Sequence, residues 1–111
     1  MQTKFSYAIR FTADMERTIA FYRDRLGLKV RFATPFWTEF ETGEVTLALH
    51  PASGENPAGT VQLGFRTDDV VRLHADAAAN GLEFSAPPRD EHGTLLARVR
   101  DVDGVEISLS S

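Results

Sequence analysis

The sequence predicts one α+β domain in which two β-α-β-β-β modules form a cupped, mainly antiparallel sheet of eight strands. The main observation is an internal repeat: residues 5–30 and 59–84 each contain an apolar strand, an Asp, an amphipathic helix, a Gly and a second strand. The remaining strands alternate apolar and polar residues with a period of two, which is typical of half-buried strands. Because only two copies fit, each copy is a supersecondary unit and not one step of a solenoid.

A shift of 54 positions without a gap superposes the two halves. It places Tyr7 on Val61, Asp14 on Asp68 and Gly27 on Gly81. Neither copy can bury its apolar face alone. We therefore expect a pseudo-symmetric sheet with a pocket between the modules.

The first module is expected to span residues 1–50 and the second residues 60–111, joined by a linker over 51–59 that is rich in Pro and Gly. In the first module we expect a helix that begins after Asp14 and ends at Gly27. The strands expected around it cover residues 5–12, 28–33, 36–40 and 45–50.

In the second module we expect strands over 60–67, 82–85, 94–100 and 105–109, with a helix over 69–80 and a loop over 87–93. The last two strands are joined by a turn that contains Asp103-Gly104, a strong hairpin signal because tight turns of this kind require positive φ.

Composition excludes several classes of protein. The chain has 111 residues and a net charge of −4 without a Lys/Arg cluster, which argues against a nucleic-acid partner. It has no cysteine, which excludes disulfides and thiolate chemistry, and no apolar run long enough to span a bilayer. We therefore expect a cytoplasmic protein with no membrane partner.

Two segments carry a family resemblance: Phe-Tyr-Arg-Asp-Arg-Leu-Gly-Leu over residues 21–28, and Asp-Val-Asp-Gly over 101–104. In order and spacing the chain resembles the vicinal oxygen chelate superfamily, which comprises glyoxalase I, bleomycin-resistance proteins and extradiol dioxygenases. The resemblance implies paired βαβββ modules and a homodimer whose pocket is completed across the interface. Val102 stands where the family usually has Pro. An exposed aromatic strand over 36–40 and unpaired sheet edges also favour a homodimer.

The resemblance also implies a divalent metal held by His, Gln or Glu on four strands. The matching position on the first strand is Tyr7 in the family register, or Ser6 or Ala8 under the ungapped repeat. The other three positions are Ala48, Gln62 and Ser108. Only Gln62 is a plausible ligand, since such metals need several imidazole, carboxylate or amide donors. We therefore expect no metal and no other cofactor.

Alternation along the strands predicts one polar face that holds a binding site. Its members are His50, Gln62, Arg66, Glu106 and Ser108. Arg66 suits a planar anion, and His50 suits a general base. In the alternative without a binding site, Arg66 pairs with Glu106 across the sheet, and His50 only ends a strand.

Trp37 and Glu39 are predicted to point the same way and to form an aromatic wall beside a carboxylate, which suits a flat or cationic guest. In the alternative, Phe36, Trp37 and Phe40 are core or interface residues. His92 is expected at a loop rim and His74 on a helix surface.

Three functions fit these features. The first is a metal-free protein that sequesters an aromatic or cationic small molecule, with Tyr7, Trp37, His50, Gln62, Arg66 and Ser108 as ligand-binding residues. The second is a glyoxalase- or dioxygenase-like enzyme that uses His50 with Glu39 or Glu106, or an unusual metal site. The third is a structural module whose cup is filled by side chains. The sequence leaves open whether the protein is an enzyme.

Overall fold

The computed structural model describes residues 2–111, which form strands and short helical segments. The strands are β1 (Thr3–Thr12), β2 (Lys29–Ala33), β3 (Thr38–Glu41), β4 (Thr46–Pro51), β5 (Val61–Thr67), β6 (Glu83–Glu91), β7 (Thr94–Arg100) and β8 (Glu106–Ser110). The helical segments are α1 (Met15–Ala20), the π-helix η1 (Phe21–Arg25), α2 (Val70–Ala75) and α3 (Ala77–Asn80). No helix among these residues has the length and apolarity needed to cross a bilayer.

The eight strands form a mixed, open sheet in the order β2-β3-β4-β1-β5-β8-β7-β6. β1 pairs with β4 and β5 with β8 in parallel, whereas β2-β3, β3-β4, β6-β7 and β7-β8 are antiparallel. Each half of the chain therefore has one strand, a helical segment and three further strands. This confirms the predicted α+β class with two β-α-β-β-β halves.

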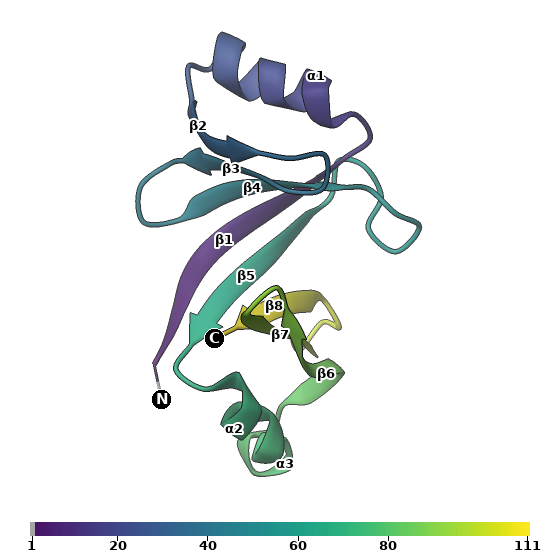
Figure 1. Cartoon of the computed structure of the whole chain (residues 1–111). Coiled ribbons are helices and arrows are strands. Elements are labelled where there is room, and N and C mark those ends of the chain that lie inside the picture. Colours follow the sequence, from purple (N-terminus) through teal and green to yellow (C-terminus); the bar gives the residue numbers. More distant parts are fainter. Residues whose placement is uncertain (1) are drawn as a thin grey trace. The chain divides into compact units, whose positions relative to one another are not determined.

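The chain divides into two compact units (Figure 1). The N-terminal unit is Ser6–Gln62, and the C-terminal unit is Leu63–Ser111 together with the described residues up to Phe5. β1 and β5 each contribute residues to both units.

In the N-terminal unit, α1 begins where the sequence predicts. The Asp14 carboxylate accepts a hydrogen bond from the backbone N–H of Arg17 at 3.1 Å, so it satisfies one of the free donors of the first turn. After Ala20 the helix widens into η1, and the N–H of Leu26 bonds the carbonyl of Phe21. Gly27 then takes φ +73°, which ends the helix.

The core of the N-terminal unit has two parts. Ile9, Phe11 and Ala48 form a buried cluster on one face of the sheet, with Tyr7 and Trp37 packed against it. The other part lies between α1 and the sheet, where α1 lies over β2 and β3 (Figure 1). Thr38, Phe40 and Leu49 are completely buried there. The Thr38 hydroxyl donates to Met15 Sδ at 3.4 Å, and the Tyr22 ring lies 5.6 Å from that of Phe40. Phe40 is therefore a core residue, and the prediction of an exposed aromatic strand over 36–40 was wrong for this end of it.

The helix of the C-terminal unit begins one residue later than the predicted repeat. Asp69, and not Asp68, caps α2, and its carboxylate accepts from the backbone N–H of Arg72 at 3.1 Å. Since Asp14 is the equivalent cap of α1, the halves repeat with a shift of 55 positions through the first strand and the helix start. The expected helix over 69–80 also breaks at Asp76 into α2 and α3.

An apolar core holds the C-terminal unit together. Val70 from α2 packs with Ala97 and Val99 of β7 and Leu109 of β8, all buried. Phe65 and Leu73 are among the partly buried residues against this cluster.

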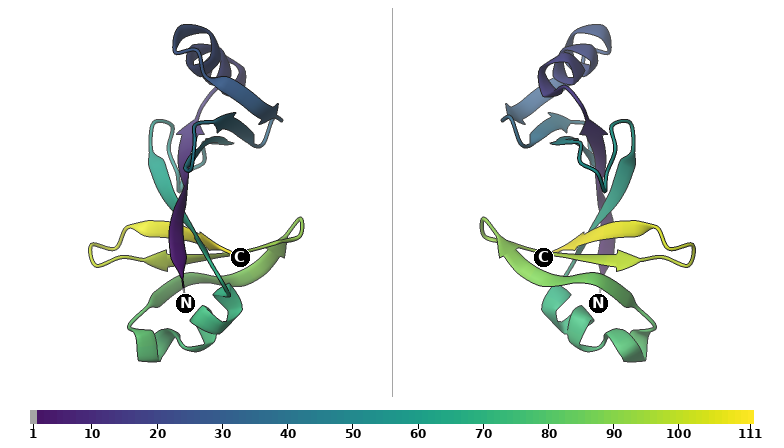
Figure 2. Two further views of the ribbon diagram at one scale, coloured as in Figure 1. Left: turned by 90° about the vertical axis from the view of Figure 1, so that its left-hand side faces the viewer. Right: turned by 90° about the vertical axis from the view of Figure 1, so that its right-hand side faces the viewer.

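The main error of the sequence prediction concerns β6, which was expected as a short strand over 82–85 followed by a loop. The strand instead runs from Glu83 to Glu91, beside β7 and next to α2 and α3 (Figure 2). Pro87 and Pro88 lie where its register against β7 shifts, between Ala86 and Arg89. Because β6 is an edge strand, a proline without an N–H is tolerated at such an irregularity.

We expect Leu49→Ala to lower the free energy of unfolding by about 2–5 kcal/mol, because it leaves a cavity under α1 where the side chain is 0% exposed. Denaturant titration measures this loss. Val102→Ala is the control: Val102 is 100% exposed, so its truncation should change stability by less than about 0.5 kcal/mol. Equal effects of the two substitutions would contradict this assignment of the core.

Candidate functional site

The strand register of the N-terminal unit separates two faces of its sheet. In the parallel β1–β4 pair, Tyr7 lies opposite Thr46, Ile9 opposite Ala48 and Phe11 opposite His50. These residues share the face that turns away from α1, because Leu49, the neighbour of Ala48 and His50, lies in the core under α1. We call this side the aromatic face; its members are Tyr7, Ile9, Phe11, Arg31, Trp37, Glu39, Thr46, Ala48 and His50.

The rings on the aromatic face form a continuous series with Trp37 in the middle. The Trp37 ring lies 6.1 Å from that of Tyr7 and 6.2 Å from that of His50, and both contacts are edge-to-face. The His50 ring in turn lies 5.4 Å from that of Phe11. Phe11 is buried, Tyr7 and Trp37 are half-buried and His50 is exposed. The series therefore runs from the core of the face to its surface.

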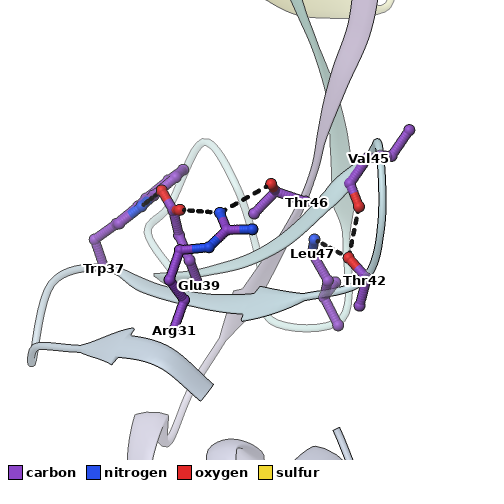
Figure 3. A network of polar contacts seen from close by, with 7 residues as sticks. All are labelled: Arg31, Trp37, Glu39, Thr42, Val45, Thr46 and Leu47. Carbon is purple, nitrogen blue, oxygen red and sulfur yellow. Dashed lines mark hydrogen bonds and ion pairs between the residues drawn. The ribbon is translucent and has the colours of Figure 1, made fainter. Parts of the chain in front are cut away.

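A polar network fixes Trp37 (Figure 3). The indole N–H of Trp37 donates to Glu39 Oε2 at 2.8 Å, and the Arg31 guanidinium pairs with Glu39 Oε1 at 2.9 Å. The same Arg31 nitrogen lies 3.3 Å from the hydroxyl of Thr46. The Glu39 side chain is only 12% exposed, so its charge is balanced mainly by Arg31. The network orients the indole and leaves little net charge beside it.

The sequence predicted that Trp37 and Glu39 act together, and they do contact each other, but it did not identify Arg31. Arg31 lies on β2, whose register against β3 shifts between Val30 and Phe32. This bulge changes the alternation from which the face of Arg31 would have been inferred.

His50 keeps one ring nitrogen available. Its Nδ1 lies 2.8 Å from the carbonyl oxygen of Pro51. Because a carbonyl only accepts, Nδ1 carries the proton, and in the neutral ring Nε2 is then the acceptor. The exposed imidazole thus has the tautomer that suits a base or a hydrogen-bond acceptor.

The other three predicted ligand-binding residues lie on β5 and β8. Gln62 is buried in the N-terminal unit. Arg66 and Ser108 belong to the C-terminal unit, where Arg66 is exposed and lies opposite Ser110 in the β5–β8 register. Their role in ligand binding stays a prediction.

Glu106, another member of the predicted polar face, has partners in the C-terminal unit. It accepts a hydrogen bond from the Ser85 hydroxyl at 2.7 Å and pairs with Arg98 at 3.8 Å.

The remaining two histidines lie in the C-terminal unit. The His74 ring contacts Phe84 at 4.8 Å from the exposed side of α2. His92 occupies the two-residue turn between β6 and β7 with φ +56°, next to Gly93 with φ +90°. His92 therefore sits in a tight hairpin turn and not in the long loop that was predicted.

The two positions of the predicted metal set that lie on β1 and β4 carry no usual donor. Tyr7 contacts Trp37 through its ring, and Ala48, whose side chain is a methyl group, is completely buried. The shift of 55 positions pairs Tyr7 with Gln62, which favours the family register over Ser6 or Ala8. Within residues 2–111, no group of three or more His, Cys, Asp or Glu side chains is placed to hold a metal ion.

Comparison with known proteins places the chain in a superfamily. Residues 4–109 match the model of the Glyoxalase/Bleomycin resistance protein/Dioxygenase superfamily, so the chain belongs to it. This confirms the resemblance to the vicinal oxygen chelate proteins. No functionally curated protein sequence matches significantly.

Solved structures with this fold share little sequence with the chain. A hypothetical protein from Bacillus halodurans C-125 is 14% identical with a TM-score of 0.81, over 99% of this chain and 94% of its own. Methylmalonyl-CoA epimerase from Streptomyces coelicolor, as a variant in complex with 2-nitronate-propionyl-CoA, is 20% identical with a TM-score of 0.79, over 99% and 94%. A superfamily member from Vibrio splendidus 12B01 is 15% identical with a TM-score of 0.69, over 98% of each chain. At these identities the similarity shows the fold alone.

We expect Glu39→Ala to shift the fluorescence of Trp37 to longer wavelength, because the indole loses its acceptor and becomes mobile and hydrated. The substitution should also cost about 1–2 kcal/mol of stability. Since Trp37 is the only tryptophan of the chain, emission spectra measure it directly. Glu41→Ala is the control, because Glu41 pairs with Lys29 at the surface. An unchanged spectrum in Glu39→Ala would contradict the network.

Proposed function

We propose that this protein binds and sequesters a small, flat organic molecule on the aromatic face, without the divalent metal of its superfamily. The observation that carries the proposal is the ring series with Trp37 held at its centre by Glu39. Aromatic side chains supply large apolar contact area, and a tryptophan whose orientation is already fixed loses little entropy on binding.

The metal-free part of the proposal rests on the chemistry of the four matching positions. They hold a phenol, a methyl group, an amide and a hydroxyl, at Tyr7, Ala48, Gln62 and Ser108. A divalent cation in this superfamily needs imidazole, carboxylate or amide ligands converging on it. This set does not fit such a metal, so we derive no reaction step through one.

The network of Arg31, Glu39 and Trp37 makes a preference for a cationic ligand less strongly supported than the sequence alone did. The sequence alone placed a free carboxylate beside Trp37, which would attract a cation. In the structure Arg31 already balances Glu39. We therefore infer that the aromatic surface of the guest matters more than its charge.

The alternative is an enzyme that uses His50 with Glu39. The tautomer of His50 favours it, since Nε2 is left as an acceptor. Against it, both oxygens of Glu39 are engaged, by Trp37 and by Arg31. His50 would then act as a base without that carboxylate as its partner.

We further propose that the protein is a homodimer. Leu26 and Phe36 are 58% and 75% exposed, and β2 is an edge strand. Large exposed apolar side chains and an unpaired edge are features that a second copy would cover. Light scattering should give a dimer mass across the micromolar range, and a monomer mass throughout would refute this proposal.

The binding proposal predicts saturable quenching of Trp37 fluorescence by 2-naphthol, a neutral aromatic probe. N-Methylquinolinium, a cationic probe of similar size, should bind within about tenfold of it, which is a difference of about 1.4 kcal/mol. Clear preference for the cation would show that the negative charge of Glu39 contributes to binding. No saturable quenching by either probe would contradict an aromatic site at Trp37.

His50→Ala should weaken binding of the tighter probe while leaving the melting temperature nearly unchanged, because an exposed imidazole at a strand end contributes little to the core. Calorimetric titration measures the affinity. His74→Ala, which removes an exposed histidine from the C-terminal unit, should leave binding as it is. If His50→Ala binds normally and is destabilised instead by about 1 kcal/mol, His50 is structural.

A further inference from the structure

A hollow of the N-terminal unit lies on the opposite side of the sheet from the aromatic face. It is an open groove of about 770 Å³ between β1, α1 and η1, bordered also by Ala58 of the connection to β5. Its volume lies within the range of about 300–1,000 Å³ typical of small-molecule sites. The proposed function does not use it.

The groove exists because β1 carries polar residues under its helix. With the shift of 55 positions, Arg10 is the counterpart of Phe65, which packs into the core of the C-terminal unit. Arg10 instead lines the groove, and its guanidinium bonds the carbonyl of Phe11. Neither α1 nor η1 contains a fully buried residue, whereas α2 buries Val70. The N-terminal unit thus keeps a polar space where the C-terminal unit has apolar packing.

The charge of the groove is positive although the whole chain is negative. Arg10, Arg17 and Arg25 line it, together with the carboxylates of Asp14 and Asp24. Arg23, which is not among the lining residues, neutralises Asp24 through two hydrogen bonds of 2.7 and 3.0 Å. Those hydrogen bonds hold the pKa of Asp24 below its ordinary value, with a smaller contribution from the charges of Arg23 and Arg25.

Arg17 and Arg25 have guanidinium N–H groups that can donate hydrogen bonds to a ligand. Asp14 accepts from the backbone N–H of Arg17, so its carboxylate serves the helix cap. Among the ion pairs of residues 2–111, none involves the guanidinium of Arg17 or of Arg25. Both side chains are exposed and free to meet a ligand.

The body of the groove is fixed and partly apolar. The hydroxyls of Thr12 on β1 and Thr18 on α1 lie 2.6 Å apart, which ties the helix to the strand at the groove. Phe21 and Tyr22 add two rings, 5.3 Å apart and nearly perpendicular. A ligand would therefore meet cationic groups and aromatic surface in one place.

We propose that this groove binds a small organic oxyanion, with a phosphate or carboxylate held by Arg17 and Arg25 and an aromatic or aliphatic body resting on Phe21 and Tyr22. Guanidinium groups bind both oxyanions through paired, charge-assisted hydrogen bonds. The site is independent of the aromatic face, so either can fail without the other.

The test is an NMR titration of the full chain with phenyl phosphate and, separately, with benzoate. Backbone amide signals of Thr18 and Tyr22 should shift saturably, and those of Trp37 and Glu39 should not. Arg17→Gln combined with Arg25→Gln should weaken binding by at least about tenfold, since charge-assisted hydrogen bonds contribute on this scale. Whichever probe binds more tightly identifies the oxyanion.

Two controls complete the test. Arg89→Gln removes one exposed arginine from the C-terminal unit, where it pairs with Glu91, and should leave the affinity within about twofold. Benzyl alcohol, which lacks the charge, should not shift the groove signals. The proposal is overturned if neither oxyanion shifts the groove signals, which is the result expected if a second copy fills the groove. It is also overturned if benzyl alcohol binds equally well, or if the double variant binds like the unaltered protein.

Discussion

The parallel register of β1 against β4 is the constraint on which both faces of the N-terminal unit depend. It places Leu49 under α1 and sends Ala48 and His50 to the opposite side, beside Ile9 and Phe11. Because side chains alternate with a period of two, a slip of one residue would exchange the faces. His50 would then lie under the helix and Leu49 among the aromatic rings. The burial of Leu49 therefore stabilises the fold and also positions the candidate site.

The two sides of this unit use arginine differently. On the aromatic face, Arg31 is committed to Glu39, and the pair holds the indole of Trp37 in one orientation. The Glu39 carboxylate is largely removed from solvent and is balanced by the more exposed Arg31, so the surface beside the indole is nearly neutral. On the other side, Arg17 and Arg25 keep their guanidinium donors available. One unit thus presents a neutral, pre-oriented aromatic surface and a cationic groove.

The sequence predicted the class of fold and the start of the first helix, because alternation and an N-cap aspartate are local signals. The ungapped repeat matched Asp14 with Asp68, whereas Asp69 caps the second helix; the two residues are adjacent, and only tertiary packing decides between them. This difference of one position changes which residues of β1 are matched with which residues of β5. It therefore also changes which side of β1 is predicted to face the helix. The extended β6 was missed because Pro87 and Pro88 are tolerated only through an edge position and a bulge, neither of which a local pattern reveals.

For the candidate site, the sequence predicted Trp37, Glu39 and His50, because tryptophan, glutamate and histidine are residue types typical of binding and catalytic sites. It did not find Arg31, whose role follows from a bulge in β2, and it gave Phe40 as a core or interface residue only in its alternative. The contacts among Arg31, Glu39 and Thr46 join β2, β3 and β4, so the pattern of no single strand predicts them.

The most direct test of the account follows the side-chain indole signal of Trp37 in a ¹H–¹⁵N spectrum during titration with 2-naphthol. The chain has one tryptophan, so the signal is unambiguous. If the ligand binds on the aromatic face, this signal should move saturably and by more than most backbone amides, because the ligand lies against a ring whose N–H is fixed on Glu39. Saturable shifts elsewhere in the spectrum with an unmoved indole would contradict it.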